Sequence, residues 1–286
     1  MSKTQYIFLI LLCTAAVAAF FLWPYETEPS LPSNEARLLQ QEEADFATST
    51  ASTTPDHHQN VSSVRVPILV YHIVRPSYPS DTAAVKEFAV TPEIFDEEMA
   101  YLRDNGYHVI PFSALENYFY KGTPLPSRPV ILNFDDAWED QYVYAFPILE
   151  KYHYTATFFV PTNFPGQRSF LAWDQLRTIA AAGMTIGSHS ESHPYLTSIT
   201  STSTLWKEIY GSKQVLQNEL GTTTDEFDYP FGMYNNAIMS MVEAAGYKAA
   251  RADYLGLNQS RTNIYKLGAL NAPTDMLTFA AYFPRR

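Results

Sequence analysis

The sequence predicts an α/β fold, an irregular (β/α)7-type barrel in which parallel strands alternate with helices. Two observations support this prediction. Short apolar runs typical of buried strands alternate with longer segments whose apolar residues recur at helical spacing. About seven such strand–helix units in roughly 220 residues fit a closed barrel better than an open sheet. In such a barrel the chemistry lies at the C-terminal ends of the strands.

The expected strands are short and mainly apolar. They cover residues 66–71, 107–110, 129–134, 155–160, 184–188, 226–229, 247–250 and 264–267. The expected helices carry an apolar face, and several of them stop at a glycine, as helix C-termini commonly do. They cover residues 92–105, 113–120, 138–152, 173–182, 205–220, 235–245 and 274–282.

An uncharged apolar run precedes this domain. Residues 6–25 carry no charge, and the run is close to the length that spans a bilayer. Trp23 and Tyr25 suit a membrane interface, and Lys3 gives a mild positive charge on the N-terminal side. We therefore expect a single-pass signal anchor that leaves the rest of the chain outside the cytoplasm, at the cell membrane.

The expected organisation has three parts. Residues 1–25 form the anchor, or alternatively a signal peptide cleaved after the small residues 16–18, which would give a secreted protein. Residues 26–63 are rich in Ser, Thr, Glu, Pro and Gln and are expected to form a flexible linker. Residues 64–286 form the folded domain.

Composition excludes several classes of site. Cys13 is the only cysteine and lies in the apolar run, so the exported part has no disulfide framework and no thiolate metal site. A metal would have to be held by histidines and carboxylates. The net charge of −11 and the absence of a basic patch argue against nucleic acid as a partner.

Polar residues follow two of the predicted strands. Asp135 and Asp136 come after the apolar run 129–132, and a second apolar run leads into His189, with His193 four residues later. Two imidazoles and one carboxylate are a common ligand set for catalytic zinc. One of the two aspartates would complete the set, and the other would be free to take a proton from the attacking water.

Three motifs in order then resemble the polysaccharide deacetylases of carbohydrate esterase family four, the NodB homology domain. They are Asn-Phe-Asp-Asp at 133–136, His-Ser-Glu-Ser-His-Pro at 189–194 and Tyr-Pro-Phe-Gly at 229–232. The opening Leu-Val-Tyr-His at 69–72 is similar to the branch that acts on poly-N-acetylglucosamine-type exopolysaccharide. The resemblance covers roughly residues 64–284 and implies a NodB-like barrel.

The resemblance implies a metal-dependent hydrolase that removes N-acetyl groups from N-acetylglucosamine units of a cell-surface or extracellular polysaccharide. Asp136, His189 and His193 would bind a divalent metal, most commonly zinc. Asp135 would be the general base. The backbone N–H of Phe231 would stabilise the oxyanion.

The chain departs from the family pattern in four places, two of which are Asn133 for the usual Thr and Ala137 for the usual Gly. Asp228 stands where the family often has an arginine that orients the base. The C-terminal Leu-x-His motif, which usually carries the general acid, is replaced by residues 267–269. Among the seven histidines, His72 alone follows a strand at the catalytic end without being a metal ligand. We therefore predict that His72 is the general acid.

Four residues are expected to contact substrate. Trp173 and Tyr195 are candidates because sugar faces stack on aromatic rings, although packing at a helix start explains Trp173 equally well. Tyr229 and Pro230 are included because they belong to the third motif.

Two alternative functions are consistent with the same sequence. An O-acetyl esterase acting on a xylan-like glycan would use the same metal machinery. A catalytically inert glycan-binding module would account for the missing arginine and Leu-x-His motif, although the paired aspartates and histidines argue against it.

Overall fold

The computed structural model describes residues 63–252 and 256–285. The predicted anchor, and the predicted linker up to residue 62, lie outside these described residues. The described residues belong to one compact unit. Within the described ranges, no helix combines the length and the apolar character needed to cross a membrane.

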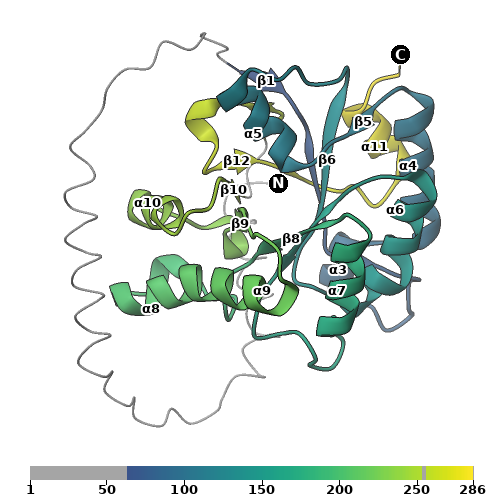
Figure 1. The fold of residues 1–286 in the computed structure, drawn as a ribbon. Helices are drawn as coiled ribbons and strands as arrows, with labels where there is room; N and C mark the ends of the chain where they lie inside the picture. The colour runs from purple at the N-terminus through teal and green to yellow at the C-terminus, as the bar shows by residue number, and fades with distance from the viewer. Residues whose placement is uncertain (1–62, 253–255, 286) are drawn as a thin grey trace, which may run out of the picture. The chain divides into compact units, whose positions relative to one another are not determined.

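A curved sheet of parallel strands forms the centre of this unit (Figure 1). Its strands are, in spatial order, β12 (Leu267–Gly268), β10 (Ala249–Ala252), β9 (Glu226–Asp228), β8 (Thr185–Ser188), β7 (Thr157–Val160), β6 (Pro129–Phe134), β2 (Ile68–Tyr71) and β13 (Leu270–Asn271). A short strand, β5 (His108–Val109), pairs with the start of β6. Outside this sheet, β1 (Val64–Arg65) pairs with β11 (Asn258–Gln259), and β3 (Ile73–Val74) pairs with β4 (Ala89–Val90).

One short segment closes the sheet on itself. The first and last strands in spatial order, β12 and β13, are separated in sequence only by Ala269. β12 pairs with β10 and β13 pairs with β2, so residues 267–271 join the two edges. The ring contains eight named strands, but β12 and β13 belong to one continuous segment and occupy one position. The ring therefore has seven strand positions. The predicted seven-unit barrel is therefore confirmed.

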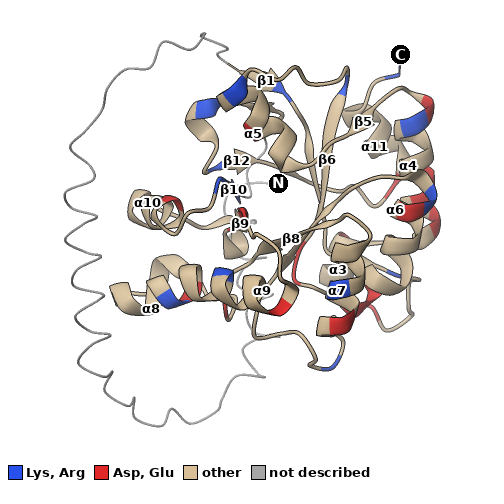
Figure 2. Ribbon diagram, in the orientation of Figure 1, with Lys and Arg blue, Asp and Glu red and all other residues tan. Residues whose placement is uncertain are grey.

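Helices cover the outside of this ring (Figure 1). They are α3 (Ala83–Phe88), α4 (Pro92–Asp104), α5 (Phe112–Lys121), α6 (Phe146–Tyr152), α7 (Trp173–Ala181), α8 (Thr202–Trp206), α9 (Ser212–Leu220), α10 (Asn236–Ala244) and α11 (Met276–Tyr282). Acidic and basic residues lie mainly on the helices and loops, while the strands are largely uncharged (Figure 2).

Helix α4 illustrates how local sequence sets these boundaries. The Thr91 hydroxyl accepts a hydrogen bond from the Ile94 N–H at 3.3 Å and so caps the first turn, which begins with Pro92. Phe95 and Met99, spaced at one helical turn, are completely buried against the sheet. The start of this helix and its buried face are as predicted.

The two faces of the strands enter different parts of the core. Ile68 and Ile131 belong to one apolar cluster, whereas Leu69 and Leu132 belong to another that packs under α4, α6, α7 and α11. This alternation follows from the two-residue period of a strand. The side of the strands that carries Ile131 is the side on which the polar residues of the site emerge.

Gly187 on β8 shows how closely the interior is packed. A Cβ atom at this position would lie 2.5 Å from Cε1 of Phe159, which is closer than such atoms approach in proteins. The absence of a side chain lets the completely buried ring of Phe159 lie against β8, two residues before His189.

Two predicted helices contain a π-helical turn. The segment expected at 138–152 has a π-helix at Gln141–Ala145 (η1) that runs into α6. The segment expected at 205–220 is α8, a π-helix at Lys207–Gly211 (η3) and then α9. π-turns insert one residue into a helix and are frequent at functional sites.

Candidate active site

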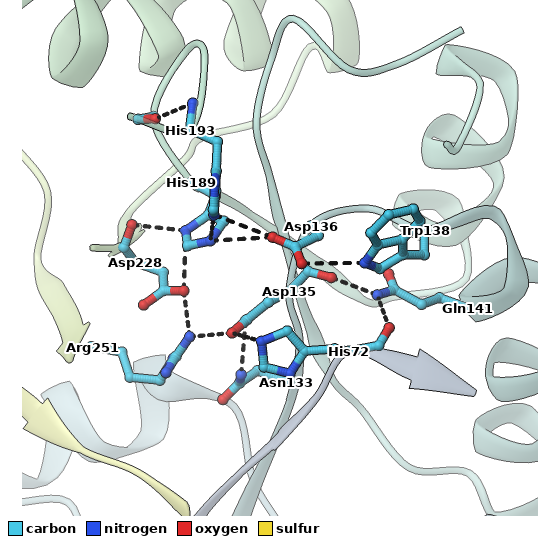
Figure 3. A network of polar contacts seen from close by, with 11 residues as sticks. His72, Asn133, Asp135, Asp136, Trp138, Gln141, His189, His193, Asp228 and Arg251 are labelled. Carbon is cyan, nitrogen blue, oxygen red and sulfur yellow. Dashed lines mark hydrogen bonds and ion pairs between the residues drawn. The ribbon is translucent and has the colours of Figure 1, made fainter. Parts of the chain in front are cut away.

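The polar residues of the site line one face of neighbouring strands. Asn133 and Asp135 follow Ile131 at two-residue steps, so they point to the same side of β6. Arg251 stands two residues after Ala249 on β10, and His72 two residues after Val70 of β2. These side chains therefore meet at the C-terminal end of the barrel (Figure 3).

Asp136 reaches the same place through an unusual backbone conformation. Strand alternation alone would direct it with Phe134, away from the site. Its φ of 70° breaks the alternation, and Ala137 follows with a φ of 58°. The Trp138 indole N–H donates to Asp136 Oδ2 at 3.2 Å and leaves Oδ1 directed toward the histidines.

Three donor atoms converge at the predicted metal site. Asp136 Oδ1 lies 3.3 Å from His193 Nε2 and 3.6 Å from His189 Nε2, and the two Nε2 atoms are 3.0 Å apart. In a tetrahedral zinc site with ligand distances of about 2.0–2.2 Å, neighbouring donors lie about 3.3–3.6 Å from one another. The three side chains therefore have both the chemistry and the spacing of a divalent-metal ligand set.

The tautomer of His189 fits this role. Its Nδ1 lies 3.0 Å from the backbone oxygen and 3.1 Å from Oδ2 of Asp228, two acceptors that place the proton on Nδ1. Nε2 is then left with its lone pair facing Asp136 and His193. Burial lowers the pKa of His189 well below its ordinary value, and the neighbouring His193 lowers it further. The imidazole is therefore held neutral, the form that binds metal.

Arg251 connects the two buried carboxylates of the site. Its guanidinium donates to Oδ2 of Asp135 and to Oδ2 of Asp228, and all three side chains are almost inaccessible to solvent. Asp228 occupies the position where an arginine was expected, and the arginine comes instead from the next strand of the sheet. A cation beside the predicted base is thus supplied by β10.

Asp135 is also held from its other side. Asn133 Nδ2 donates to Asp135 Oδ1 at 3.2 Å. Gln141, in η1, donates to the backbone oxygens of Asp135 at 2.6 Å and of His72 at 2.8 Å. His72 Nε2 lies 3.7 Å from Asp135 Oδ2, and its ring is half-buried. The predicted base and the predicted acid are therefore neighbours (Figure 3).

Phe231, expected to supply an oxyanion donor, lies beside the predicted metal ligand His193. Its φ is 60°, and its ring is 4.6 Å from that of His193. In the described part of the chain, no acceptor is found for the Phe231 backbone N–H. The ring is 44% exposed and stacks on Tyr195, with centroids 4.0 Å apart and an interplanar angle of 12°.

The four residues predicted to contact substrate differ in how far they are exposed. Tyr195 contributes to this exposed aromatic surface. Trp173 is half-buried against the core at the start of α7, which agrees with a packing role. Tyr229 and Pro230 are buried, and the Tyr229 hydroxyl donates to the backbone oxygen of Tyr265. Tyr229 lies one residue out of phase with Asp228 and faces the outer helices. The substrate contact of Tyr229 and Pro230 stays a prediction.

Strained backbone is concentrated here. Four of the eight described non-glycine residues with positive φ belong to the three motifs, namely Asp136, Ser190, His193 and Phe231, and a fifth, Ala137, directly follows the first motif. Left-handed conformations in such residues cost free energy and persist where the surroundings enforce them. The fold therefore holds the backbone of these residues in conformations that are unfavourable in free energy.

Arg251, Trp138 and Gln141 were not identified from the sequence. The expected strand ended at Ala250, so Arg251 was assigned to a loop. A signal was present, because a charged residue within Ala-Ala-Arg-Ala is unusual for a buried strand and indicates a partner of opposite charge.

Comparison with known proteins agrees with this geometry. The family model for polysaccharide deacetylase matches residues 122–250. The chain is 25% identical over 259 residues to the protein named "Putative polysaccharide deacetylase YxkH" of Bacillus subtilis (strain 168). This match covers 90% of this chain and 87% of YxkH. It is 27% identical over 203 residues to the poly-beta-1,6-N-acetyl-D-glucosamine N-deacetylase of Staphylococcus aureus (strain MRSA252), covering 63% of this chain and 69% of that protein.

Solved structures show the same fold. The deacetylase PplD of Streptococcus pyogenes, determined in complex with acetate, superimposes with a TM-score of 0.71 at 28% identity, covering 75% of this chain and 95% of PplD. IcaB from Ammonifex degensii matches in fold with a TM-score of 0.68 at 22% identity, covering 77% of this chain and 96% of IcaB. These matches confirm the resemblance carried by the motifs and the expected class of hydrolase: the domain resembles the polysaccharide deacetylases in sequence and in fold.

Proposed function

We propose that this protein is a metal-dependent deacetylase that removes acetyl groups from N-acetylglucosamine units of a cell-surface or extracellular polysaccharide. The observation that carries the proposal is the convergence of Asp136, His189 and His193 beside a buried aspartate, Asp135. The N-deacetylase among the relatives supports an amide substrate.

A divalent cation held by Asp136, His189 and His193, with zinc the metal that best suits these ligands, would supply Lewis acidity that lowers the pKa of water and polarises a carbonyl. Asp135 would accept a proton as water adds to the acetyl carbon. The Phe231 N–H would donate to the oxygen that gains negative charge.

The second half of the reaction requires an acid. As the C–N bond breaks, the electron pair goes to the amine nitrogen, and His72 would give that nitrogen a proton. Acetate and a free amino sugar are the products. The position of His72, 3.7 Å from Asp135 Oδ2 and half-buried, supports this assignment.

The proposal extends to location. The apolar run at residues 6–25 supports a membrane anchor with the enzyme outside the cytoplasm, where a polysaccharide would be its partner. Each deacetylation would leave an amine on the polymer, and the acidic protein would tolerate a cationic product.

Metal removal tests the proposal. Purified full-length protein should release acetate from β-1,6-linked N-acetylglucosamine oligomers, lose that activity after treatment with a chelator, and regain it when zinc or cobalt is added. Chitin oligomers, peptidoglycan and acetyl-xylan assayed in parallel distinguish the N-deacetylase from the O-acetyl esterase. Metal-bound protein that releases acetate from none of these glycans would support the inert binding module instead.

A change at His72 tests the acid. His72→Ala should reduce turnover of the amide by about 10²–10⁴-fold, the usual contribution of a general acid. It should affect an activated acetyl ester much less, because a good leaving group departs without a proton. An equal loss on both substrates would contradict the role of His72 as the acid.

A further inference from the structure

The two histidine ligands stand at the ends of a short loop with an unfavourable backbone. Ser190 and His193 have φ values of 65° and 58°. Within the loop, the Ser190 hydroxyl accepts a hydrogen bond from the His193 N–H at 3.0 Å. Such conformations persist only where surrounding groups hold them in place.

Glu208 is such a group. Its Oε2 accepts hydrogen bonds from the backbone N–H of Glu191 at 3.0 Å and of Ser192 at 2.8 Å, and its Oε1 accepts from the Ser192 hydroxyl at 2.6 Å. The side chain is buried, with 7% of the residue exposed. A single carboxylate thus satisfies three donors of the loop immediately before His193.

Glu208 lies in the π-helix η3, which is also bonded to neighbouring elements. Its Ile209 carbonyl accepts hydrogen bonds from the hydroxyls of Ser212 and Tyr247, each at 2.8 Å. Ser212 Oγ also lies 2.7 Å from Ser188 Oγ, at the end of β8. The helix is therefore fixed to the strand just before His189 and to the loop just before His193.

We propose that Glu208 is a positioning residue that holds His189 and His193 in the metal-binding arrangement before the metal arrives. This inference rests on the proposed function for the identity of the ligands, but Glu208 itself contacts neither the ligand atoms nor the expected substrate. It acts through the backbone of Glu191 and Ser192. Partners that orient metal ligands in this way typically contribute 10–100-fold to metal affinity.

The test compares Glu208→Ala with Glu208→Gln in the full-length protein. Alanine removes all three acceptors, so the dissociation constant for Zn²⁺ or Co²⁺, measured by competition with a chromogenic chelator, should rise by about 10–100-fold. Glutamine should preserve most of the affinity, because its amide oxygen can accept from both backbone N–H groups and its amide NH₂ can donate to Ser192 Oγ.

A second readout requires no metal. In the metal-free protein, hydrogen exchange at the Glu191 and Ser192 amides should accelerate in Glu208→Ala and stay slow in Glu208→Gln. Glu116→Ala is the matched control, because Glu116 is also a buried helical glutamate but is coupled to Asp225 and Lys248 rather than to this loop. Its metal affinity should equal that of the unchanged protein, whatever its stability.

The possible results distinguish the positioning role of Glu208 from the proposed function. Wild-type metal affinity and unchanged amide exchange in Glu208→Ala would overturn the positioning role. A lower melting temperature with an unchanged metal dissociation constant would also overturn it and leave Glu208 as a stabilising residue only. Failure of the unchanged protein to bind metal would refute the proposed function, and the amide exchange would still decide the role of Glu208.

Discussion

Asp135→Asn is expected to lower the turnover number by about 10²–10⁴-fold while the metal stays bound. Asparagine preserves the shape of the side chain but cannot take a proton from the attacking water. The ligands Asp136, His189 and His193 are untouched, and Asp228 remains as a partner for Arg251. The prediction therefore separates loss of the base from loss of the metal.

Metal content and turnover measured on the same preparation check this prediction. Asp136→Asn is the matched control, since it changes the adjacent carboxylate and should reduce metal affinity as well as turnover. If Asp135→Asn kept full turnover, Asp135 would not be the base. If it lost the metal, the two aspartates would have been assigned the wrong roles.

Arg251→Met is expected to have the largest effect on stability. The guanidinium is 1% exposed and bonds to two carboxylates that are equally buried. Removing it leaves Asp135 and Asp228 without that positive charge in a place that water hardly reaches. Breaking a buried ion pair in this way costs about 3–5 kcal/mol in the free energy of unfolding.

Urea denaturation at neutral pH measures this loss, and Arg251→Lys provides a milder version. Lysine keeps the charge, but its ammonium lacks the planar fork that contacts both carboxylates, so an intermediate stability is expected. The double variant Arg251→Met with Asp228→Asn should lose less free energy of unfolding than the sum of the two single variants. The second change removes one of the two buried carboxylate charges that Arg251 contacts. A variant Arg251→Met as stable as the unchanged protein would show that the buried pair contributes little.

Much of the barrel could be predicted because local chemistry and the final fold agree. The apolar run 129–134 became β6 with the expected bounds, and the Thr91 cap set the start of α4. The convergence of Asp136, His189 and His193 could be predicted for the same reason, since these residues follow strand ends where barrels place their polar groups.

The rest depended on information that a single sequence does not display. Pattern matching assigned Tyr229 to the site, but the phase of β9 directs Asp228 inward and Tyr229 outward. The π-turn that contains Glu208 adds one residue to a helix, a change too small for a 3.6-residue periodicity to reveal. Arg251 was hidden by a strand boundary placed two residues too early.

The central claim is that Asp136, His189 and His193 jointly hold one metal ion next to Asp135. Anomalous diffraction from crystals of the protein grown with zinc tests it most directly. We expect a single strong peak about 2.0–2.2 Å from Asp136 Oδ1, His189 Nε2 and His193 Nε2. A peak bound elsewhere, or none at this site in zinc-saturated crystals, would contradict the account.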